Sequence, residues 1–248
     1  MQEPVKPGEG AVVVGAGESG SAAASLLMAL GARVRLLERN RDAVPDEFWT
    51  LADEGRLDVL TGEHLPAYFR GARLVVTSPG IPVGVLGPLL AESDGAALMA
   101  ELELALRYVQ EPILAVTGTS GKTTTVSLAA AMLEEAGKKV FLGGNIGTPL
   151  SRYVLGGAGA DVLVLELSSF QLQATDSLRP RVAVLLNLSE NHLDHHKDMA
   201  EYAEAKFRIF AGQSGDDLAV LPPELLAAYE QGGFGARVAV FRPGGRFN

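Results

Sequence analysis

The chain contains no cysteine, no long apolar run and no block of lysine or arginine residues. The absence of cysteine excludes disulfides and thiolate metal sites, and it fits a reducing cytoplasm. No apolar run approaches the roughly 20 residues that a membrane helix needs. The N-terminal segment lacks the basic-then-apolar pattern of a signal peptide. We therefore expect a cytoplasmic protein without a membrane partner.

The charge balance is acidic, because 21 Lys and Arg residues stand against 30 Asp and Glu residues, for a formal net charge of -9. A nucleic-acid interface needs clustered cations to neutralise phosphates, so we expect no nucleic-acid partner. A small anionic ligand held by backbone amides and one lysine remains compatible with this composition.

Short apolar runs alternate with longer helical stretches, a pattern typical of a parallel α/β fold. We predict a Rossmann-like domain over residues 1–110 and a P-loop-type, mostly parallel α/β ATPase domain over residues 111–248. The chain ends just after a strand-like run, with no helix to cover the sheet, which predicts a fragment. The expected strands are residues 10–17, 33–39, 72–80, 111–118, 138–143, 161–168, 181–189, 217–222 and 237–242, and the expected helices are 21–31, 96–109, 123–136 and 199–211.

The first glycine-rich turn is GAGESG, residues 15–20. It matches G-x-G-x-x-G between a strand and a helix, and Glu38 ends the next strand. In this context the turn brings a helix N-terminus close to a nucleotide's phosphates, and Glu38 would accept from a ribose or base donor. A strand–helix turn that only allows close packing has the same pattern, so both interpretations stay open.

The second turn is TGTSGKTT, residues 117–124, which has Val116 where a strict P-loop has its first glycine. Its successive amides can still form an anion nest, the lysine can bridge the outer phosphates, and the first threonine hydroxyl can hold Mg²⁺. We predict that it holds the β and γ phosphates of ATP; a chance turn with an exposed lysine is the alternative. The predicted ATP-binding residues are Gly118, Thr119, Ser120, Gly121, Lys122, Thr123 and Thr124.

Two further groups follow predicted strands. Glu166 ends the apolar run DVLVLEL, where a carboxylate beside a P-loop is suited to Mg²⁺; an ion pair with a surface cation is the alternative. His192 lies in LSENHLDHH after another strand, in a cluster that could equally be a solvated loop. Lys206 lies among apolar residues on an expected helix, a pattern that by itself indicates a surface lysine whose stem packs on the protein.

Five motifs, VTGTSGKTTT, GGNIGTPL, LELSSFQLQ, NLSENHLDHH and YAEAKFRIF, together resemble the Mur ligase family, the ATP-dependent amide-forming enzymes of peptidoglycan assembly. The run ELSSFQL, with GAGESG and TSPGI ahead of it, is similar to the members that add D-glutamate to UDP-N-acetylmuramoyl-L-alanine. The resemblance covers the whole chain. It implies a cytoplasmic ligase, here without the family's C-terminal domain, which helps to bind ATP and carries the D-glutamate site. We expect a monomer.

The resemblance also implies roles for individual residues. Lys122, His192 and Lys206 would be catalytic. The metal ligands for two Mg²⁺ ions would be Thr123, Glu166, His192 and Lys206, the last as a carbamate. The residues that bind the UDP substrate would be Gly17, Glu18, Ser19, Glu38, Arg39, Ser78, Asn145 and His192. The residues around Glu38, ERN, depart from the family pattern.

In the reaction that the resemblance implies, ATP phosphorylates the L-alanine carboxylate, and the D-glutamate amine then displaces phosphate. Without the C-terminal domain, the 248-residue chain could bind the UDP substrate yet be inactive. Three other interpretations remain open: a sister ligase that uses another amino acid, a non-catalytic nucleotide-binding module, and a nicotinamide-dependent dehydrogenase built on GAGESG.

Overall fold

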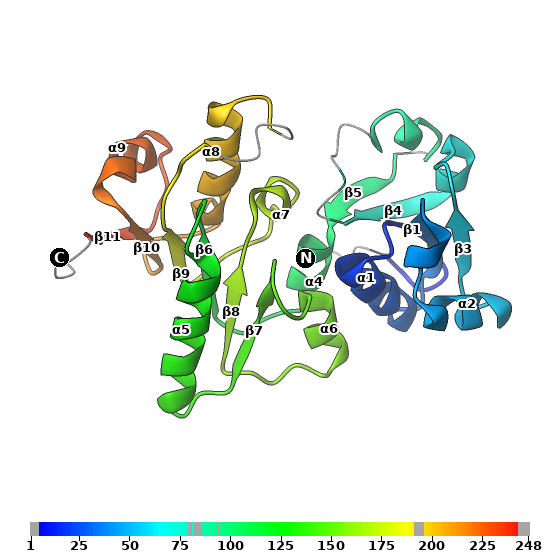
Figure 1. The fold of residues 1–248 in the computed structure, drawn as a ribbon, viewed down its shortest axis with the longest axis horizontal. Helices are drawn as coiled ribbons and strands as arrows, with labels where there is room; N and C mark the ends of the chain where they lie inside the picture. The colour runs from blue at the N-terminus through cyan, green and yellow to red at the C-terminus, as the bar shows by residue number, and fades with distance from the viewer. Residues whose placement is uncertain (1–4, 79–80, 82–85, 94, 191–195, 243–248) are drawn as a thin grey trace. The chain divides into compact units, whose positions relative to one another are not determined.

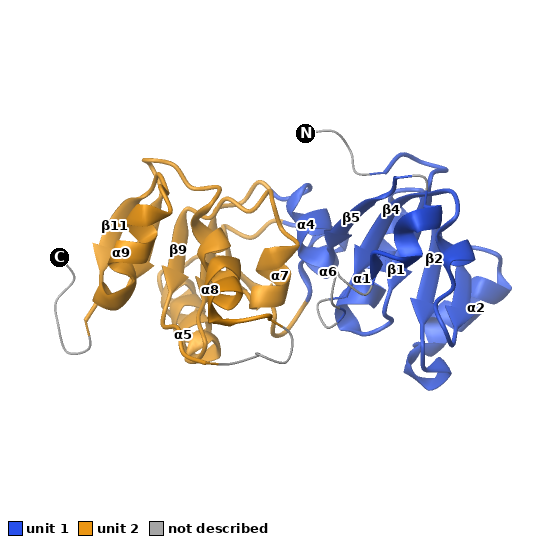
Figure 2. Ribbon diagram, turned by 90° about the horizontal axis from the view of Figure 1, so that it is seen from above, with its two compact units in different colours: residues 1–109, 149–158 blue, residues 110–148, 159–248 orange. Residues whose placement is uncertain are grey.

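The computed structural model describes residues 5–78, 81, 86–93, 95–190 and 196–242. The chain divides into two compact units (Figure 2). Unit 1 comprises Met1–Val109 and Pro149–Ala158, and unit 2 comprises Gln110–Thr148 and Gly159–Asn248. The division at residues 109 and 110 lies one residue from the predicted boundary, but residues 149–158 belong to unit 1 although the prediction placed them in the second domain.

Unit 1 is built on a parallel five-stranded sheet in the order β3-β2-β1-β4-β5 (Figure 1). Successive residues of β1 enter two apolar clusters, one on each face of the sheet: Val13 lies in one and Val14 in the other. This two-sided burial is typical of parallel sheets and explains the continuous apolar run GAVVV. The strands are β1 (Gly10–Val14), β2 (Arg33–Glu38), β3 (Asp58–Thr61), β4 (Ala72–Thr77) and β5 (Ala97–Ala100), and the α-helices are α1 (Glu18–Ala29), α2 (Asp46–Asp53), α4 (Glu101–Leu106) and α6 (Leu150–Leu155).

The helix predicted over residues 96–109 is wrong in its first part. Ala97–Ala100 form strand β5, and only Glu101–Leu106 are α-helical. Leu98 and Met99 pair in register with Val75 and Val76 of β4. Pairing with a buried strand therefore overrides the helical tendency of the local sequence.

Helix α6 joins unit 1 through both apolar and polar contacts. Val154 and Leu155 pack against the unit 1 core. Glu101, which is buried, accepts a hydrogen bond of 2.7 Å from the backbone N–H of Ser151 in the first turn of α6. Burial raises the pKa of Glu101, although the bond from Ser151 opposes this shift. These contacts explain why residues 149–158 belong to unit 1.

Unit 2 is built on a parallel six-stranded sheet in the order β11-β10-β9-β6-β8-β7. Because all strands are parallel, the segments after β6, β8 and β9 leave the same edge of the sheet. The strands are β6 (Ile113–Thr117), β7 (Val140–Gly144), β8 (Val162–Glu166), β9 (Val182–Leu185), β10 (Leu218–Leu221) and β11 (Arg237–Val240), and the α-helices are α5 (Lys122–Glu135), α7 (Ser169–Gln173), α8 (Met199–Phe207) and α9 (Pro223–Gln231).

Helix α5 packs on this sheet through Val126 and Ala130, which contact a cluster that includes Val116 of β6 and Val164 of β8. A second cluster is aromatic: the rings of Phe207, Phe210, Tyr229 and Phe234 contact one another in pairs. The two parallel sheets confirm the predicted α/β fold. Within the part of the chain that the structure describes, no helix has the length and apolar character needed to cross a bilayer.

Candidate functional site

The turn after β1 has the close packing that its glycines predict. Gly15 has φ +97°, and a Cβ added there would lie 2.6 Å from Ser78 Oγ, while a Cβ at Gly20 would collide with the carbonyl of Gly15. Gly17 is the N-cap of α1 and receives no side-chain cap. Gly17 and Glu18 are exposed and Ser19 is partly buried. The first-turn amides of α1 are therefore available to an anionic ligand.

Glu38 is held by backbone amides rather than left free. Its Oε2 accepts from Ala16 N at 2.9 Å, and its Oε1 accepts from Asn40 N at 3.1 Å. Arg39, in contrast, is exposed. Glu38 therefore braces the GAGESG turn, a role that the sequence prediction did not include.

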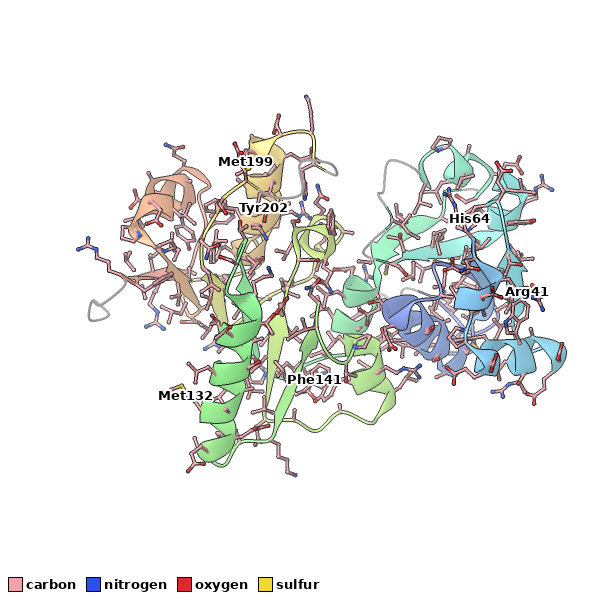
Figure 3. All side chains as sticks on the ribbon, viewed as in Figure 1. Arg41, His64, Met132, Phe141, Met199 and Tyr202 are labelled. Carbon is pink, nitrogen blue, oxygen red and sulfur yellow. The ribbon has the colours of Figure 1, made fainter. Side chains whose placement is uncertain are left out.

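Among the described residues of unit 1, two of the buried polar atoms without a hydrogen-bond partner follow strands of the sheet. One is Ser78 Oγ, directly after β4, and the other is Nε2 of His64, soon after β3. Burial, and then the positive charge of Arg39, lower the pKa of His64, although Glu38 opposes the shift. Ser78 was predicted to bind substrate and His64, labelled in Figure 3, was not. An unpaired buried polar atom such as Nε2 of His64, which lies close enough to Glu38 and Arg39 to interact with their charges, is of the kind that a bound ligand can satisfy.

In unit 2, the TGTSGKTT turn connects β6 to α5 as predicted. Gly121 is the N-cap of α5, has φ +80°, and receives no side-chain cap. A left-handed φ favours glycine at this position. The first amides of a helix have no intrahelical acceptor, so Lys122, Thr123 and Thr124 present their N–H groups at the start of α5.

Two lysines approach the same carbonyl oxygen of this turn. Lys122 Nζ donates to Gly118 O and Thr119 O, both at 3.1 Å, and Lys206 Nζ donates to Gly118 O at 2.9 Å. Among the described residues, neither lysine forms an ion pair. The ammonium of Lys122 is therefore not neutralised by an ion pair within the described residues, which suits a site for a polyanion.

Lys206 is a buried lysine, with only 2% of its surface exposed. It also lies over the ring of Tyr202, with Nζ 4.7 Å from the ring centroid; Figure 3 labels Tyr202 on α8. Burial, and then the positive charge of Lys122, lower the pKa of Lys206 to about 7, and Glu166 partly opposes this shift. The surface position indicated by its local sequence is wrong, because α8 places this side chain beneath the P-loop.

Glu166 ends β8 next to the P-loop and is 2% exposed. Its Oε2 accepts from the Thr123 hydroxyl at 2.7 Å, and its Oε1 accepts from the Asn145 side-chain amide at 2.8 Å. The oxygens of Thr123 and Glu166 are hard ligands of the kind that Mg²⁺ takes, so this pair fits the predicted metal. Asn145, predicted to touch the UDP substrate, here orients the carboxylate.

His192 lies outside the described residues, so its predicted role stays a prediction. Among the residues that the structure does describe, no group of three or more His, Asp or Glu side chains is suited to a metal ion. A metal at Glu166 would therefore depend on the Thr123 hydroxyl and on ligands from the nucleotide or water.

Sequence reasoning missed the residues that hold the P-loop in place. The hydroxyl of Thr117 donates to Leu167 O at 2.8 Å, and the side chain of Asn187 bonds to Thr119 and Ser120. Thr119 Oγ1 lies 3.2 Å from the Tyr202 hydroxyl. The two residues that form each of these contacts lie 50 to 83 positions apart in the sequence, so no local sequence pattern indicates the contacts.

Comparison with known families gives a direct match to this region, because residues 116–230 match the description of the Mur ligase middle domain. Residues 116–230 therefore form a Mur ligase middle domain. The match begins at Val116, immediately before the P-loop, and it includes Glu166 and Lys206. The resemblance drawn from the five motifs is confirmed.

Two curated proteins that are similar to this chain both carry the name UDP-N-acetylmuramoylalanine–D-glutamate ligase. The protein of Nitratidesulfovibrio vulgaris (strain DSM 19637 / Miyazaki F) is 62% identical over 223 residues, covering 86% of this chain and 50% of that protein. The protein of Desulfovibrio desulfuricans (strain ATCC 27774 / DSM 6949 / MB) is 56% identical over 248 residues, covering 98% and 57%. The chain thus spans about half the length of these relatives.

Solved structures support the Mur ligase fold. The UDP-N-acetylmuramate:L-alanyl-gamma-D-glutamyl-meso-diaminopimelate ligase from Neisseria meningitides matches with a TM-score of 0.58 at 19% identity, over 93% of this chain and 78% of that chain. MurF ligase from Thermotoga maritima, solved in complex with ADP, matches with a TM-score of 0.50 at 21% identity, over 84% and 47%. At these identities the likeness concerns the fold alone.

Proposed function

We propose that this chain is the part of an ATP-dependent ligase that binds ATP and UDP-N-acetylmuramoyl-L-alanine, and that the complete protein adds D-glutamate to that substrate. One observation carries the proposal: Lys122, Glu166 and Lys206 meet at the turn between β6 and α5. The shared name of relatives 56% and 62% identical supports the choice of D-glutamate.

The triphosphate would lie at the start of α5. The open amides of its first turn and the unpaired ammonium of Lys122 supply hydrogen bonds and positive charge to the phosphates. Thr123 and Glu166 would hold a Mg²⁺ ion, which supplies Lewis-acid stabilisation of the transferred phosphoryl group when bound.

Lys206 would carry the carbamate that the family resemblance implies. Its amine would attack CO₂, forming an N–C bond and releasing one proton, and the product would be an anion. The lowered pKa supports this role, because a lysine with a pKa of about 7 has far more neutral amine near neutral pH than an ordinary lysine, and only the neutral form is nucleophilic. With His192, the carbamate would serve a second Mg²⁺ ion.

The UDP group would bind in unit 1, at the GAGESG turn and the segments after β2, β3 and β4. The uncapped start of α1 suits a diphosphate, and the unpaired Ser78 Oγ and His64 Nε2 suit polar groups of a nucleotide. Gly15 packs so closely against Ser78 that a side chain would not fit there, as in a turn that lets a ligand approach the backbone. This close packing supports a nucleotide site, and it does not require that the nucleotide be a nicotinamide cofactor.

The chemistry follows from joining two anions. An oxygen of the L-alanine carboxylate attacks the γ-phosphorus of ATP, the bond to ADP breaks, and an acyl phosphate forms. Lys122 lowers the repulsion between carboxylate and phosphoryl oxygens by lying among them. The D-glutamate amine then attacks the acyl carbon, loses a proton, and phosphate leaves with the electron pair of the broken C–O bond.

We also propose that the protein is a monomer and that it works in the cytoplasm.

The test is an omission assay on the complete natural protein. Phosphate release is expected only when ATP, UDP-N-acetylmuramoyl-L-alanine and D-glutamate are all present. Equal turnover with another amino acid would instead indicate a sister ligase. Binding of the UDP substrate with no turnover under any condition would indicate a non-catalytic module.

A further inference from the structure

The side chain of Asn187 lies against the P-loop and bonds to two consecutive residues of it. Its Oδ1 accepts from Thr119 N at 3.1 Å and from Ser120 N at 3.0 Å, and its Nδ2 donates to Ser120 O at 3.1 Å. One carboxamide therefore engages three polar atoms of the loop backbone. Asn187 has no role in the function proposed above.

The backbone around Asn187 strengthens the same contact. Leu186 N donates to Thr117 O at 2.9 Å, which extends the pairing of β9 with β6, and Thr119 N also donates to Asn187 O at 3.1 Å. Two residues later, Ser189 N donates to Thr119 Oγ1 at 3.0 Å, and the same hydroxyl lies 3.2 Å from Ser189 O. The segment after β9 thus holds the first half of the loop along its length.

These bonds divide the loop amides into two sets. The N–H groups of Thr119 and Ser120 are engaged by Asn187, whereas those of Lys122, Thr123 and Thr124 begin α5 without a side-chain cap. The second set lies where Lys122 and the Thr123 hydroxyl are, so it is the set that can surround phosphates. The first set is already bonded within the protein, as an anchor of the loop would be.

The connection between β6 and α5 is short, and this explains why bonds from Asn187 are useful for holding it in place. A strict P-loop has a glycine at the position of Val116, but here Val116 is fully buried in β6, and only four residues connect the strand to α5. A loop that is ordered before its ligand arrives binds more tightly, because less conformational entropy is lost on binding. Bonds from β9 can supply that order.

We propose that Asn187 is a positioning residue for the triphosphate, which fixes the Thr119–Ser120 half of the loop so that the amides of residues 122–124 and Lys122 are set for the phosphates. This inference rests on the proposed ATP site. It also explains why the residue is a neutral amide: an aspartate could accept both N–H groups, but it could not donate to Ser120 O and would place a negative charge near the phosphates.

Calorimetric titration of the complete natural protein with Mg·ATP and Mg·ADP tests the proposal. Asn187→Ala is expected to weaken both affinities about tenfold or more, since the Ser120 amide loses its acceptor and the Thr119 amide keeps only the backbone carbonyl of residue 187. Asn187→Asp is expected to lie between wild type and Asn187→Ala, and to approach wild type as salt screens its charge. Ser189→Ala is the matched control, because Ser189 contacts Thr119 only through its backbone; its affinities should equal those of wild type.

Amide hydrogen exchange gives a second measurement that a general loss of stability would not reproduce. In wild type, the Ser120 amide should be protected with or without nucleotide, and the amides of Lys122, Thr123 and Thr124 should gain protection only with Mg·ATP. In Asn187→Ala, Ser120 should lose its protection while the core of the β-sheet keeps its own.

The outcomes separate this inference from the proposed function. Equal or tighter nucleotide binding by Asn187→Ala would overturn the positioning role. It would indicate instead that the Asn187 side chain occupies the loop amides in the free protein and is displaced when phosphates bind. Rapid exchange of Ser120 in wild type would overturn it as well. Failure of wild type to bind either nucleotide would overturn the ATP site itself, and the inference with it.

Discussion

Replacing Lys122 by alanine in the complete natural protein should reduce ligation by at least about 10²- to 10³-fold, the usual effect of removing one preorganised electrostatic contact in a transition state. The reason is the unpaired ammonium, which bonds only to the carbonyls of Gly118 and Thr119 in the described structure and remains available to phosphate oxygens. The measurement is phosphate release at saturating substrates, together with the dissociation constant of Mg·ATP.

Two controls test whether the loss of ligation in Lys122→Ala is specific to the ATP site. Lys138→Ala removes an exposed lysine of the same unit and should leave activity unchanged. The affinity of Lys122→Ala for UDP-N-acetylmuramoyl-L-alanine should also stay close to that of wild type, because the UDP group of that substrate is assigned to unit 1. Equal loss of both affinities would contradict the division of labour between the units.

Replacing Lys206 by methionine is expected to lower ligation about 100-fold or more, as for loss of a group that sets a metal site. Methionine fills a similar apolar volume and cannot form a carbamate.

Wild type incubated with ¹³C-labelled bicarbonate should show a carbamate carbon signal by NMR, and Lys206→Met should not. Removing CO₂ from wild type should lower its activity, and adding bicarbonate should restore it. A fully active Lys206→Met protein would exclude the carbamate from the mechanism.

The lowered pKa of Lys206 also predicts how stability changes with pH. In CO₂-free buffer, the folded chain holds this proton up to about pH 7, whereas the unfolded chain holds it up to about its ordinary pKa of 10.5. The unfolded state therefore binds more protons between these values, and the destabilisation caused by the buried charge is complete below pH 7 and declines above it. Lys206→Met should be more stable than wild type at pH 6, and thermal unfolding should show this difference narrowing toward pH 10.

Several elements could be predicted from the sequence because their signals are local. The apolar runs of β1, β6 and β8 and the glycine turns after β1 and β6 lie where the patterns place them. The position of Glu166 follows from the end of its strand, where it accepts a hydrogen bond from Thr123, the other residue of the predicted metal pair. Short-range pattern is sufficient here because strand, turn and helix follow one another without interruption.

Other features depend on contacts between distant segments. The strand nature of residues 97–100 comes from pairing with β4, and the burial of Lys206 comes from packing of α8 beneath the P-loop. Asn187 could not be singled out, because only the pairing of β9 with β6 brings it to Thr119. Residues 149–158 join unit 1 through Glu101 and the apolar core, neither of which is visible in their own sequence.

The transfer of an oxygen atom tests the central claim most directly. UDP-N-acetylmuramoyl-L-alanine labelled with ¹⁸O in the alanine carboxylate is supplied with ATP and D-glutamate to the complete natural protein, and the released phosphate is examined by mass spectrometry. If ATP activates that carboxylate through an acyl phosphate, each phosphate released in a turnover carries one ¹⁸O from the substrate. Phosphate free of ¹⁸O, formed while the amide product accumulates, would contradict this account.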